Sequence, residues 1–340
     1  MENKTKVYLR EEKITKEVLI KNQSMPNISD EIMNKWQRII NIMANILQVP
    51  AGLIMQITND SMVVFLKSQN KDNPYPDGGS DKLGHGLYCE TVIGSNNELI
   101  VENALNNKEW SDNPDVKLNM ISYYGLPIHW PNSEFFGTIC VLDNKTKNYS
   151  NDYKNLLNEF REAIETDLKT LVYENKLKYY ANMDLLTSSY NRNKIERILE
   201  KQFYNCKNED CKFAISIMDI NQLKKINDEN GHIMGDKIIK TFANSFKSRI
   251  SEECSFGRWG GDEFVLICPN HDKKTLQKKL EEIFSLITDE MKAVIPYSSY
   301  CFGCAENKKE DDDFQNILTR ADDDLYKWKR ELKKNQYKDF

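Results

Sequence analysis

The chain has 340 residues, a length that predicts two domains because one hydrophobic core rarely serves so long a chain. Hydrophobic residues make up 40% and charged residues 29%, a balance typical of chains that fold. The 47 Lys and Arg against 52 Asp and Glu leave a formal charge of -5, which argues against bulk-charge binding to nucleic acid or anionic lipid. We therefore expect no nucleic-acid partner and no membrane partner, and any phosphate-binding site must be local.

The N-terminal 30 residues carry scattered charges and no apolar core of signal-peptide length, so residues 1–30 are predicted to be a polar leader. The longest apolar runs, Phe213 to Met218 and Phe264 to Cys268, are far shorter than a membrane span. These features predict a cytoplasmic protein.

Eight cysteines are distributed along the chain. Reduced thiols are the expected state in a long chain without a secretion signal, the closely spaced Cys206 and Cys211 included. Cys301 and Cys304 have the spacing of a zinc knuckle, but residues three apart in a strand point to opposite faces. We therefore expect buried thiols there rather than a metal site.

Residues 31–150 are predicted to form an α+β domain. Glu31 to Leu47 places its apolar residues on one stripe at helical spacing, which indicates an amphipathic helix. The turn from Trp130 to Glu134 joins two strands as a hairpin, so we expect an antiparallel sheet with flanking helices. The predicted strands are Gly52–Ile57, Met62–Lys67, Leu99–Glu102, Ile121–Ile128 and Phe135–Leu142.

Residues 151–181 are predicted to be a helical linker, because Asp152 to Lys178 contains no Gly or Pro. Such a narrow apolar stripe packs against one neighbour, either its own domain or the same helix of a second chain in a coiled coil. We favour the second alternative, which predicts a homodimer. The stripe consists of Leu157, Phe160, Ile164, Leu168 and Leu171.

Residues 182–340 alternate helix and strand patterns and are predicted to form a second α+β domain with a central sheet. The expected strands are Phe213–Asp219, Ser255–Trp259, Phe264–Cys268 and Tyr297–Cys304. The expected helices begin at Arg192, Met234, Leu276 and Phe314.

The sharpest local signal is the run from Arg258 to Phe264, in which two glycines and two carboxylates lie between apolar strand segments. This pattern predicts a tight hairpin with Asp262 and Glu263 at its tip. An earlier apolar strand ends in Asp219. If the two strands are neighbours, the three carboxylates converge and repel one another unless a cation lies between them. Oxygen ligands without His or Cys select Mg²⁺ or Mn²⁺.

Mg²⁺ with few protein ligands normally shares its remaining positions with water and substrate phosphates. Lys329 and Lys333 are four residues apart in the last predicted helix and share a face. The pattern favours a phosphate-bearing substrate. Other lysines available to it are Lys224, Lys225, Lys237, Lys327 and Lys334.

Four ordered motifs resemble those of GGDEF-domain diguanylate cyclases. They are Asp184 to Arg192, Asp219 to Asp236, Gly260 to Phe264, and Ala321 to Lys329. The resemblance covers about residues 180–335. It implies a palm-like catalytic domain that condenses two GTP molecules into cyclic di-GMP and releases pyrophosphate, with two copies facing each other.

The resemblance also implies a role for each matching residue. Asp219 and the backbone carbonyl of Ile220 would hold Mg²⁺ or Mn²⁺. Asp262 and Glu263 would complete the ligand set and carry catalysis, with Asp262 activating the 3'-hydroxyl. Asn227 and Asp236 would read the guanine edge, which favours GTP over ATP. The full substrate-binding set would be Lys224, Asn227, His232, Asp236, Gly260, Gly261, Lys329 and Lys333.

Several positions depart from the family pattern. The inhibitory product site, an Arg-x-x-Asp sequence, would fall on Ser251 and Cys254 and is absent, so feedback through that site is not expected. The other departures concern local packing rather than the metal site. They are Ser188, Ser189, Asn221, Leu223, Asp324 and Trp328.

The N-terminal half resembles a GAF domain through Gly125 to Ile128 and Phe136 to Asp143, which look like the closing hairpin of that fold. GAF domains bind small ligands or dimerise, so the resemblance implies a sensor that responds to an unidentified small ligand or to redox state. Candidate pocket groups are His85, Cys89, Tyr123, Tyr124 and Trp130.

The sequence therefore predicts a GAF-regulated diguanylate cyclase that works as a homodimer. Two alternatives stay open. A non-catalytic GTP-binding regulator is disfavoured by the intact Asp219, Asp262 and Glu263, and a synthase of mixed cyclic dinucleotides is disfavoured by Asp236.

Overall fold

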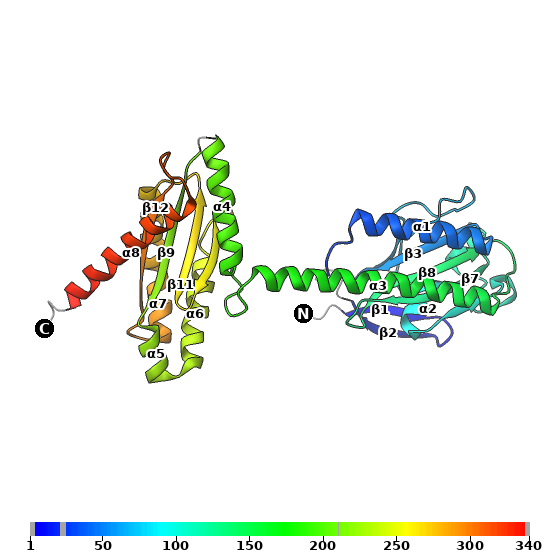
Figure 1. Ribbon diagram of the computed structural model, residues 1–340. Helices are drawn as coiled ribbons and strands as arrows, with labels where there is room; N and C mark the ends of the chain where they lie inside the picture. The colour runs from blue at the N-terminus through cyan, green and yellow to red at the C-terminus, as the bar shows by residue number, and fades with distance from the viewer. Residues whose placement is uncertain (1–3, 21–24, 210, 337–340) are drawn as a thin grey trace. The chain divides into compact units, whose positions relative to one another are not determined.

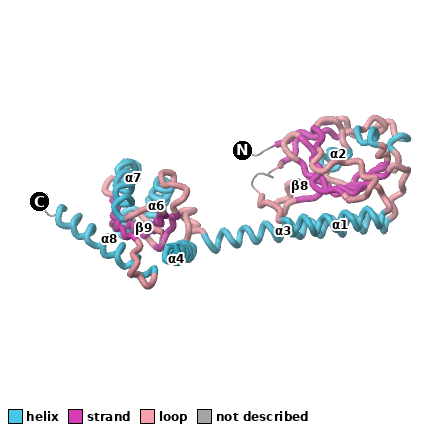
Figure 2. Tube along the Cα trace, turned by 90° about the horizontal axis from the view of Figure 1, so that it is seen from above, coloured by secondary structure: helices cyan, strands magenta, loops and turns pink. Residues whose placement is uncertain are grey.

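The computed structural model describes residues 4–20, 25–209 and 211–336, with side chains described as far as residue 331. The chain divides into two compact units, Met1–Lys176 and Leu177–Phe340. Each unit has its own antiparallel sheet and its own helices, as Figures 1 and 2 show. The expected α+β class is confirmed for both halves.

The N-terminal unit is built on a six-stranded sheet with the order β5-β4-β3-β8-β7-β6, and every neighbouring pair is antiparallel. The strands β3, β4, β6, β7 and β8 agree with the sequence prediction to within two residues at each end, whereas the short β5 was not predicted. The bounds are β3 (Ala51–Ile57), β4 (Ser61–Lys67), β5 (Ser80–Lys82), β6 (Leu99–Val101), β7 (Ser122–His129) and β8 (Phe135–Asp143).

Helices cover both faces of this sheet. On one face α1 (Asp30–Leu47) and α3 (Asn151–Asn182) share a core with strand residues such as Phe136 and Val141. The other face is covered by α2 (Tyr88–Ser95). Two short 3-10 helices, η2 (Ala104–Asn106) and η3 (Pro114–Leu118), lie between β6 and β7 in the chain.

The polar leader predicted for residues 1–30 is wrong for its described part. β1 (Lys4–Leu9) and β2 (Ile14–Leu19) pair as an antiparallel hairpin, drawn in dark blue in Figure 1, and the hairpin packs on α2. Val7 and Leu9 are buried in the core. The physical reason is the period of two along β1, because alternate polar residues stay exposed and make the average composition polar.

The predicted coiled-coil stripe of the linker helix is also corrected. Leu157, Ile164 and Leu168 are buried in the core of the N-terminal unit, beneath α3. The helix therefore uses this stripe to cover its own domain, which was the other alternative. Further along α3, Tyr173, Leu177 and Tyr180 are exposed.

The C-terminal unit contains a four-stranded antiparallel sheet with the order β10-β11-β9-β12. All four strands were predicted. A parallel bridge between Tyr190 and Gly257 adds a short contact along the outer side of β10. The bounds are β9 (Phe213–Asn221), β10 (Ser255–Gly260), β11 (Glu263–Pro269) and β12 (Ser299–Glu306).

Two helix layers enclose this sheet. One face packs against α4 (Arg192–Glu209) and α8 (Phe314–Gln336). The other face packs against α6 (His232–Lys247) and α7 (Lys273–Val294), with α5 (Leu223–Asn230) beside α6. The sequence pattern did not predict α5. Within the described residues, no helix is both long enough and apolar enough to cross a membrane.

The cysteines are not all reduced thiols, contrary to expectation. Cys206 is bonded to Cys211, and Cys254 is bonded to Cys268. The second pair follows from strand register, because Ser255 pairs with Ile267 and the next residues outward are the two cysteines. Cys301 and Cys304 remain thiols on opposite faces of β12, as expected.

Candidate active site

Two of the three carboxylates that were predicted to converge, Asp219 and Glu263, stand opposite each other at the centre of the C-terminal sheet. Asp219 on β9 lies directly opposite Glu263 on β11 and opposite Cys301 on β12. Because directly opposed residues share a face, these side chains lie on the α4 and α8 side. The backbone of the adjoining turn is tied to the same strand, since Ile220 donates its N–H to the carbonyl of Asp262 at 3.1 Å.

A cation from α8 completes this cluster. The Nζ of Lys329 lies 2.9 Å from Oδ2 of Asp219. The reach of Lys329 depends on a close approach of α8 to β12 at Gly303, where a Cβ would collide with the backbone of Ala321 and Leu325. Leu325 and Lys329 are one helical turn apart, so the contact at Gly303 sets the depth of the ammonium group.

Burial raises the pKa of both opposed carboxylates, Asp219 and Glu263. Asp219 is only 7% exposed, and this desolvation raises its pKa, partly opposed by the hydrogen bond from Lys329. Desolvation also raises the pKa of Glu263, with further contributions from the charges of Asp219 and Asp262. Burial beside Asp219 raises the pKa of the Cys301 thiol to about 12, so this thiol stays protonated.

The hairpin turn between β10 and β11 is held by hydrogen bonds from Arg258, and the space next to its two glycines is open. Arg258 donates to the carbonyl of Gly261 through Nε at 3.0 Å and Nη2 at 2.7 Å, and its Nη1 lies 3.3 Å from Oδ2 of Asp184. Gly261 has a φ of 52°, in the left-handed region that favours glycine. A Cβ on Gly260 or Gly261 would meet nothing within 4 Å. A ligand can therefore approach this backbone closely.

The fit of a divalent cation can be judged from these donors. Asp219 and Glu263 supply two hard carboxylates on one face, the number that Mg²⁺ often takes from protein when phosphates fill its other positions. Within the described residues, no group of three or more His, Cys, Asp or Glu is placed to hold a metal. The residues fit a cation that is shared with substrate, with Lys329 beside it, and do not fit a closed protein cage.

The predicted guanine-reading residues lie at the junction of α5 and α6. The Oδ1 of Asn227 is buried without a hydrogen-bond partner, and a Cβ on Gly235 would collide with it. A buried acceptor without a donor costs about 1–3 kcal/mol, so a donor from a ligand would relieve it. Asp236 follows Gly235 directly and is exposed, as are Lys224 and His232.

Not every predicted site residue is brought to the carboxylate cluster. Asp219, Glu263 and Lys329 are brought together, and the backbone carbonyl of Asp262 is tied to Ile220 beside them. The predicted α5 and α6 residues lie elsewhere, at the junction of those two helices. Lys333 lies in α8 beyond the last described side chain, so its predicted role stays a prediction.

Sequence reasoning did not assign a role to Arg258 or to the Asp184 carboxylate. Asp184 also accepts from the N–H of Thr187 at 2.9 Å, which organises the loop before α4. The sequence did offer one signal for this ion pair: the two residues have opposite charges, and each begins a motif, Asp184 to Arg192 and Arg258 to Phe264. Pairing them requires the fold, because the two positions are 74 residues apart.

Residues 181–335 match the family model described as Diguanylate cyclase, GGDEF domain. The C-terminal unit therefore contains a GGDEF domain, and the sites described above lie in it.

Curated relatives are similar over part of their length. The chain is 25% identical over 231 residues to Diguanylate cyclase DgcP of Escherichia coli (strain K12), covering 65% of this chain and 67% of the relative. It is 31% identical over 170 residues to a Diguanylate cyclase of Vibrio cholerae serotype O1, covering 49% of this chain and 53% of the relative. The chain thus spans between half and two thirds of these proteins.

Two solved structures from Caulobacter crescentus are similar to part of this chain. One is the GGDEF domain of DgcB in complex with c-di-GMP, at 26% identity, a TM-score of 0.42, and coverage of 44% of this chain and 91% of that chain. The other is the coiled coil and GGDEF domain of DgcB in the same complex, at 21% identity, a TM-score of 0.47, and coverage of 53% and 95%.

Proposed function

We propose that this protein is a diguanylate cyclase, an enzyme that joins two GTP molecules into cyclic di-GMP and releases two pyrophosphates. The observation that carries the proposal is the pairing of Asp219 with Glu263 in register, with the Lys329 ammonium at 2.9 Å, inside a GGDEF domain. The relatives named as diguanylate cyclases support an enzyme of this class.

Asp219 and Glu263 are the residues that would hold Mg²⁺, with the carbonyl of Ile220 and the carboxylate of Asp262 as further candidate ligands. When bound, the metal would lower the pKa of the attacking 3'-oxygen and neutralise phosphate charge. The protein keeps both carboxylates on one rigid sheet face, which favours a single geometry for the triphosphate.

Phosphoryl transfer demands positioning and charge stabilisation. Lys329 supplies a positive charge beside the carboxylate pair, where it would stabilise the negative charge of the leaving pyrophosphate. The glycine turn lets the triphosphate approach the backbone, because no side chain stands above Gly260 and Gly261. At the other end of the nucleotide, the unpartnered Oδ1 of Asn227 would accept an N–H from guanine, together with the Asp236 carboxylate.

Regulation by the N-terminal unit is part of the proposal. Its antiparallel sheet, with α1 and α3 on one face and α2 on the other, supports the GAF resemblance.

A homodimer is supported by Tyr173, Leu177 and Tyr180, which are exposed at steps of four and three residues on α3. In this proposal, a signal in the N-terminal unit changes how two GTP-loaded domains meet.

The test is to incubate the purified chain with Mg²⁺ and GTP, ATP or both, and to identify the products by mass spectrometry. Cyclic di-GMP from GTP alone is the expected product. Asp262→Ala should reduce its rate by at least about a hundredfold, because one carboxylate of the site is lost. Asp289→Ala, which removes an exposed carboxylate on α7, is the matched control and should retain the rate.

The remaining outcomes separate the alternatives. Mixed products from GTP and ATP would favour the synthase of mixed cyclic dinucleotides. GTP binding without any product, over a range of protein concentrations that varies dimer formation, would favour the non-catalytic regulator and would sink the enzyme proposal.

A further inference from the structure

The N-terminal unit contains a buried cluster of sulfur and hydroxyl groups that the cyclase chemistry does not use. Cys89 is the second residue of α2, and its Sγ lies 3.4 Å from the hydroxyl of Tyr123 on β7. Cys140 and Thr138 lie two residues apart on β8 and share a face. All of these residues are at most 8% exposed.

Strand register brings the two thiols together. Cys140 pairs directly with Gly125 on β7. The space above Gly125 holds the hydroxyl of Tyr123, since a Cβ at that position would collide with it. The same hydroxyl contacts Cys89. Cys89 and Cys140 are therefore neighbours, both placed beside the Tyr123 hydroxyl.

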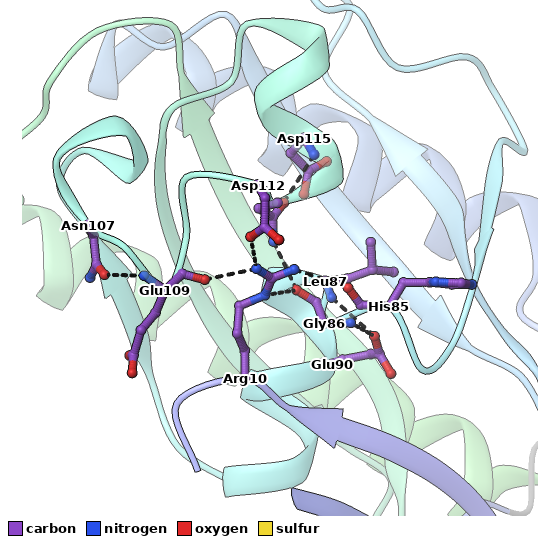
Figure 3. A network of polar contacts seen from close by, with 10 residues as sticks. Arg10, His85, Gly86, Leu87, Glu90, Asn107, Glu109, Asp112 and Asp115 are labelled. Atoms are coloured by element: carbon purple, nitrogen blue, oxygen red, sulfur yellow. Dashed lines mark hydrogen bonds and ion pairs between the residues drawn. The ribbon is translucent and has the colours of Figure 1, made fainter. Parts of the chain in front are cut away.

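The start of α2 is fixed firmly, as Figure 3 shows for the network of Arg10 and Glu90. The buried Glu90 carboxylate accepts from the N–H groups of Gly84 at 2.6 Å, Gly86 at 2.8 Å and Leu87 at 3.1 Å. Arg10 donates to the carbonyl of Gly86 at 3.1 Å. Cys89 is thus held at a helix N-terminus, where the backbone stabilises a thiolate.

We propose that Cys89 and Cys140 form a redox site that reacts with hydrogen peroxide, with Cys89 as the attacking sulfur and Cys140 as the resolving sulfur. The choice of oxidant follows from access. Cys89 is 8% exposed and Cys140 is fully buried, so a molecule about the size of water can reach the pair while a bulky disulfide cannot.

The two thiols have opposite acid-base character. The hydrogen bond from Cys140 is the main reason that the pKa of Cys89 is lowered, with Thr138 and Tyr123 contributing and burial opposing. Burial raises the pKa of Cys140, which keeps its proton and donates it. The hydroxyl of Thr138 is buried without a conventional partner, so it is available to the sulfur. The free cysteines of the C-terminal unit differ, because burial raises the pKa of Cys301 and Cys304 to about 12.

The reaction balances in two steps. The Cys89 thiolate attacks one peroxide oxygen, the O–O bond breaks, and the departing hydroxide takes a proton to become water, leaving a sulfenic acid on Cys89. Cys140 then attacks the Cys89 sulfur, an S–S bond forms, and the hydroxyl leaves with the Cys140 proton as a second water. Two electrons pass from the two thiols to one peroxide.

The test uses the full-length protein, fully reduced, freed of reductant and titrated with hydrogen peroxide. Alkylation and peptide mapping by mass spectrometry then locate disulfides and sulfenic acid. The expected result is a Cys89–Cys140 disulfide at doses that leave Cys301 and Cys304 as thiols. In Cys140→Ser, a sulfenic acid should instead persist on Cys89 and be captured by dimedone when the oxidised protein is unfolded in its presence.

Two further variants separate chemistry from packing. Tyr123→Phe keeps the ring and removes one donor, so peroxide oxidation of Cys89 should slow by about threefold to tenfold. Cys304→Ser is the control and should leave the Cys89–Cys140 disulfide unchanged. If Cys140→Ser does not fold, Cys140→Ala replaces it.

The proposal is overturned if Cys89 oxidises no faster than Cys304. It is also overturned if sulfenic acid accumulates on Cys89 of the unmodified sequence without a bond to Cys140. Neither readout depends on cyclase activity, so the failure of this proposal and the failure of the proposed function can be told apart.

Discussion

Lys329 is the residue on which the candidate active site depends most directly. It is the cation 2.9 Å from the buried Asp219 carboxylate, and it stands on a different element from both carboxylates. Losing it would leave Asp219 desolvated beside Glu263, so the Asp219 pKa would rise further. A carboxylate that takes up a proton can no longer hold a cation.

We therefore expect Lys329→Met to reduce cyclic di-GMP formation by about a hundredfold at neutral pH, because charge stabilisation in a buried site is lost. The rate at saturating GTP is the measurement. Lys278→Met, which removes an exposed lysine on α7, is the matched control and should stay within about twofold of the starting rate. A Lys329→Met rate equal to the control rate would remove Lys329 from the site.

Asp115 allows a prediction about pH. Burial raises the pKa of this carboxyl to about 6, although the Tyr75 hydroxyl donates to it at 2.7 Å. The folded-state pKa lies above the unfolded value, so the folded state binds the proton more tightly. The contribution of Asp115 to stability therefore becomes unfavourable as pH rises from about 4 to about 6 and stays so above that range.

Asp115→Asn mimics the protonated form. At pH 7 it should stabilise the N-terminal unit by about 1–2 kcal/mol, a figure reduced for the partial exposure of the side chain. At pH 4 the gain should vanish. Thermal unfolding of both proteins across this pH range measures the difference, and a gain that is independent of pH would contradict the assignment.

At the scale of single residues, the sequence predicted that Asp219 meets Asp262 and Glu263, and the structure opposes Asp219 and Glu263. An acid at the end of a buried strand and an acid after a glycine turn meet if their strands are neighbours, and β9 and β11 are. The hydrogen bonds from Arg258 to Gly261 and its ion pair with Asp184 were not predictable in this way. It depends on loop conformations that no periodicity encodes.

At the scale of elements, the contact of α8 with β12 positions the cation. The helix lies so close at Gly303 that any side chain there would enter its backbone. Asp324, which departs from the family pattern, fits here because its Oδ2 accepts the N–H of Cys304 at 2.9 Å. A buried edge N–H thereby gains a partner.

Gly303→Ala should push α8 away from the sheet and destabilise the C-terminal unit by about 2–3 kcal/mol, the usual cost of overpacking. Cyclic di-GMP formation should fall as well, because Lys329 moves with the helix. Gly260→Ala is the control for stability, since a Cβ there meets nothing within 4 Å, and should change it by no more than about 0.5 kcal/mol. Urea unfolding compares the two variants.

Helices and strands were predicted well where the apolar residues recur with a single period, helical or strand-like, along the segment. The strands of both sheets and helices α1, α3 and α4 lie close to their predicted positions. The hairpin of β1 and β2 was missed because its outer face is polar, so the segment reads as a leader. The disulfide between Cys254 and Cys268 was missed because it depends on the register between β10 and β11, which the apolar pattern of the two strands does not fix.

At the scale of the whole molecule, the two units have separate cores. The division between them falls between Lys176 and Leu177, within α3. The buried clusters of the N-terminal unit share no residue with those of the C-terminal unit.

Separate cores predict separate unfolding. Calorimetry of the full chain should resolve two transitions, each of which responds to substitutions in its own unit only. Gly303→Ala should lower one transition by about 4–10 °C and leave the other in place. Asp115→Asn at pH 7 should raise the transition temperature of the N-terminal unit. A single transition that moves with both substitutions would mean that the units unfold as one.

The outer strands of the C-terminal sheet carry one more consequence. On β12 the N–H of Cys304 already donates a hydrogen bond to the side chain of Asp324. On β10 the backbone of Gly257 already forms a parallel bridge with Tyr190. A foreign strand therefore finds main-chain positions already taken on either flank, which protects the sheet against runaway growth by strand addition.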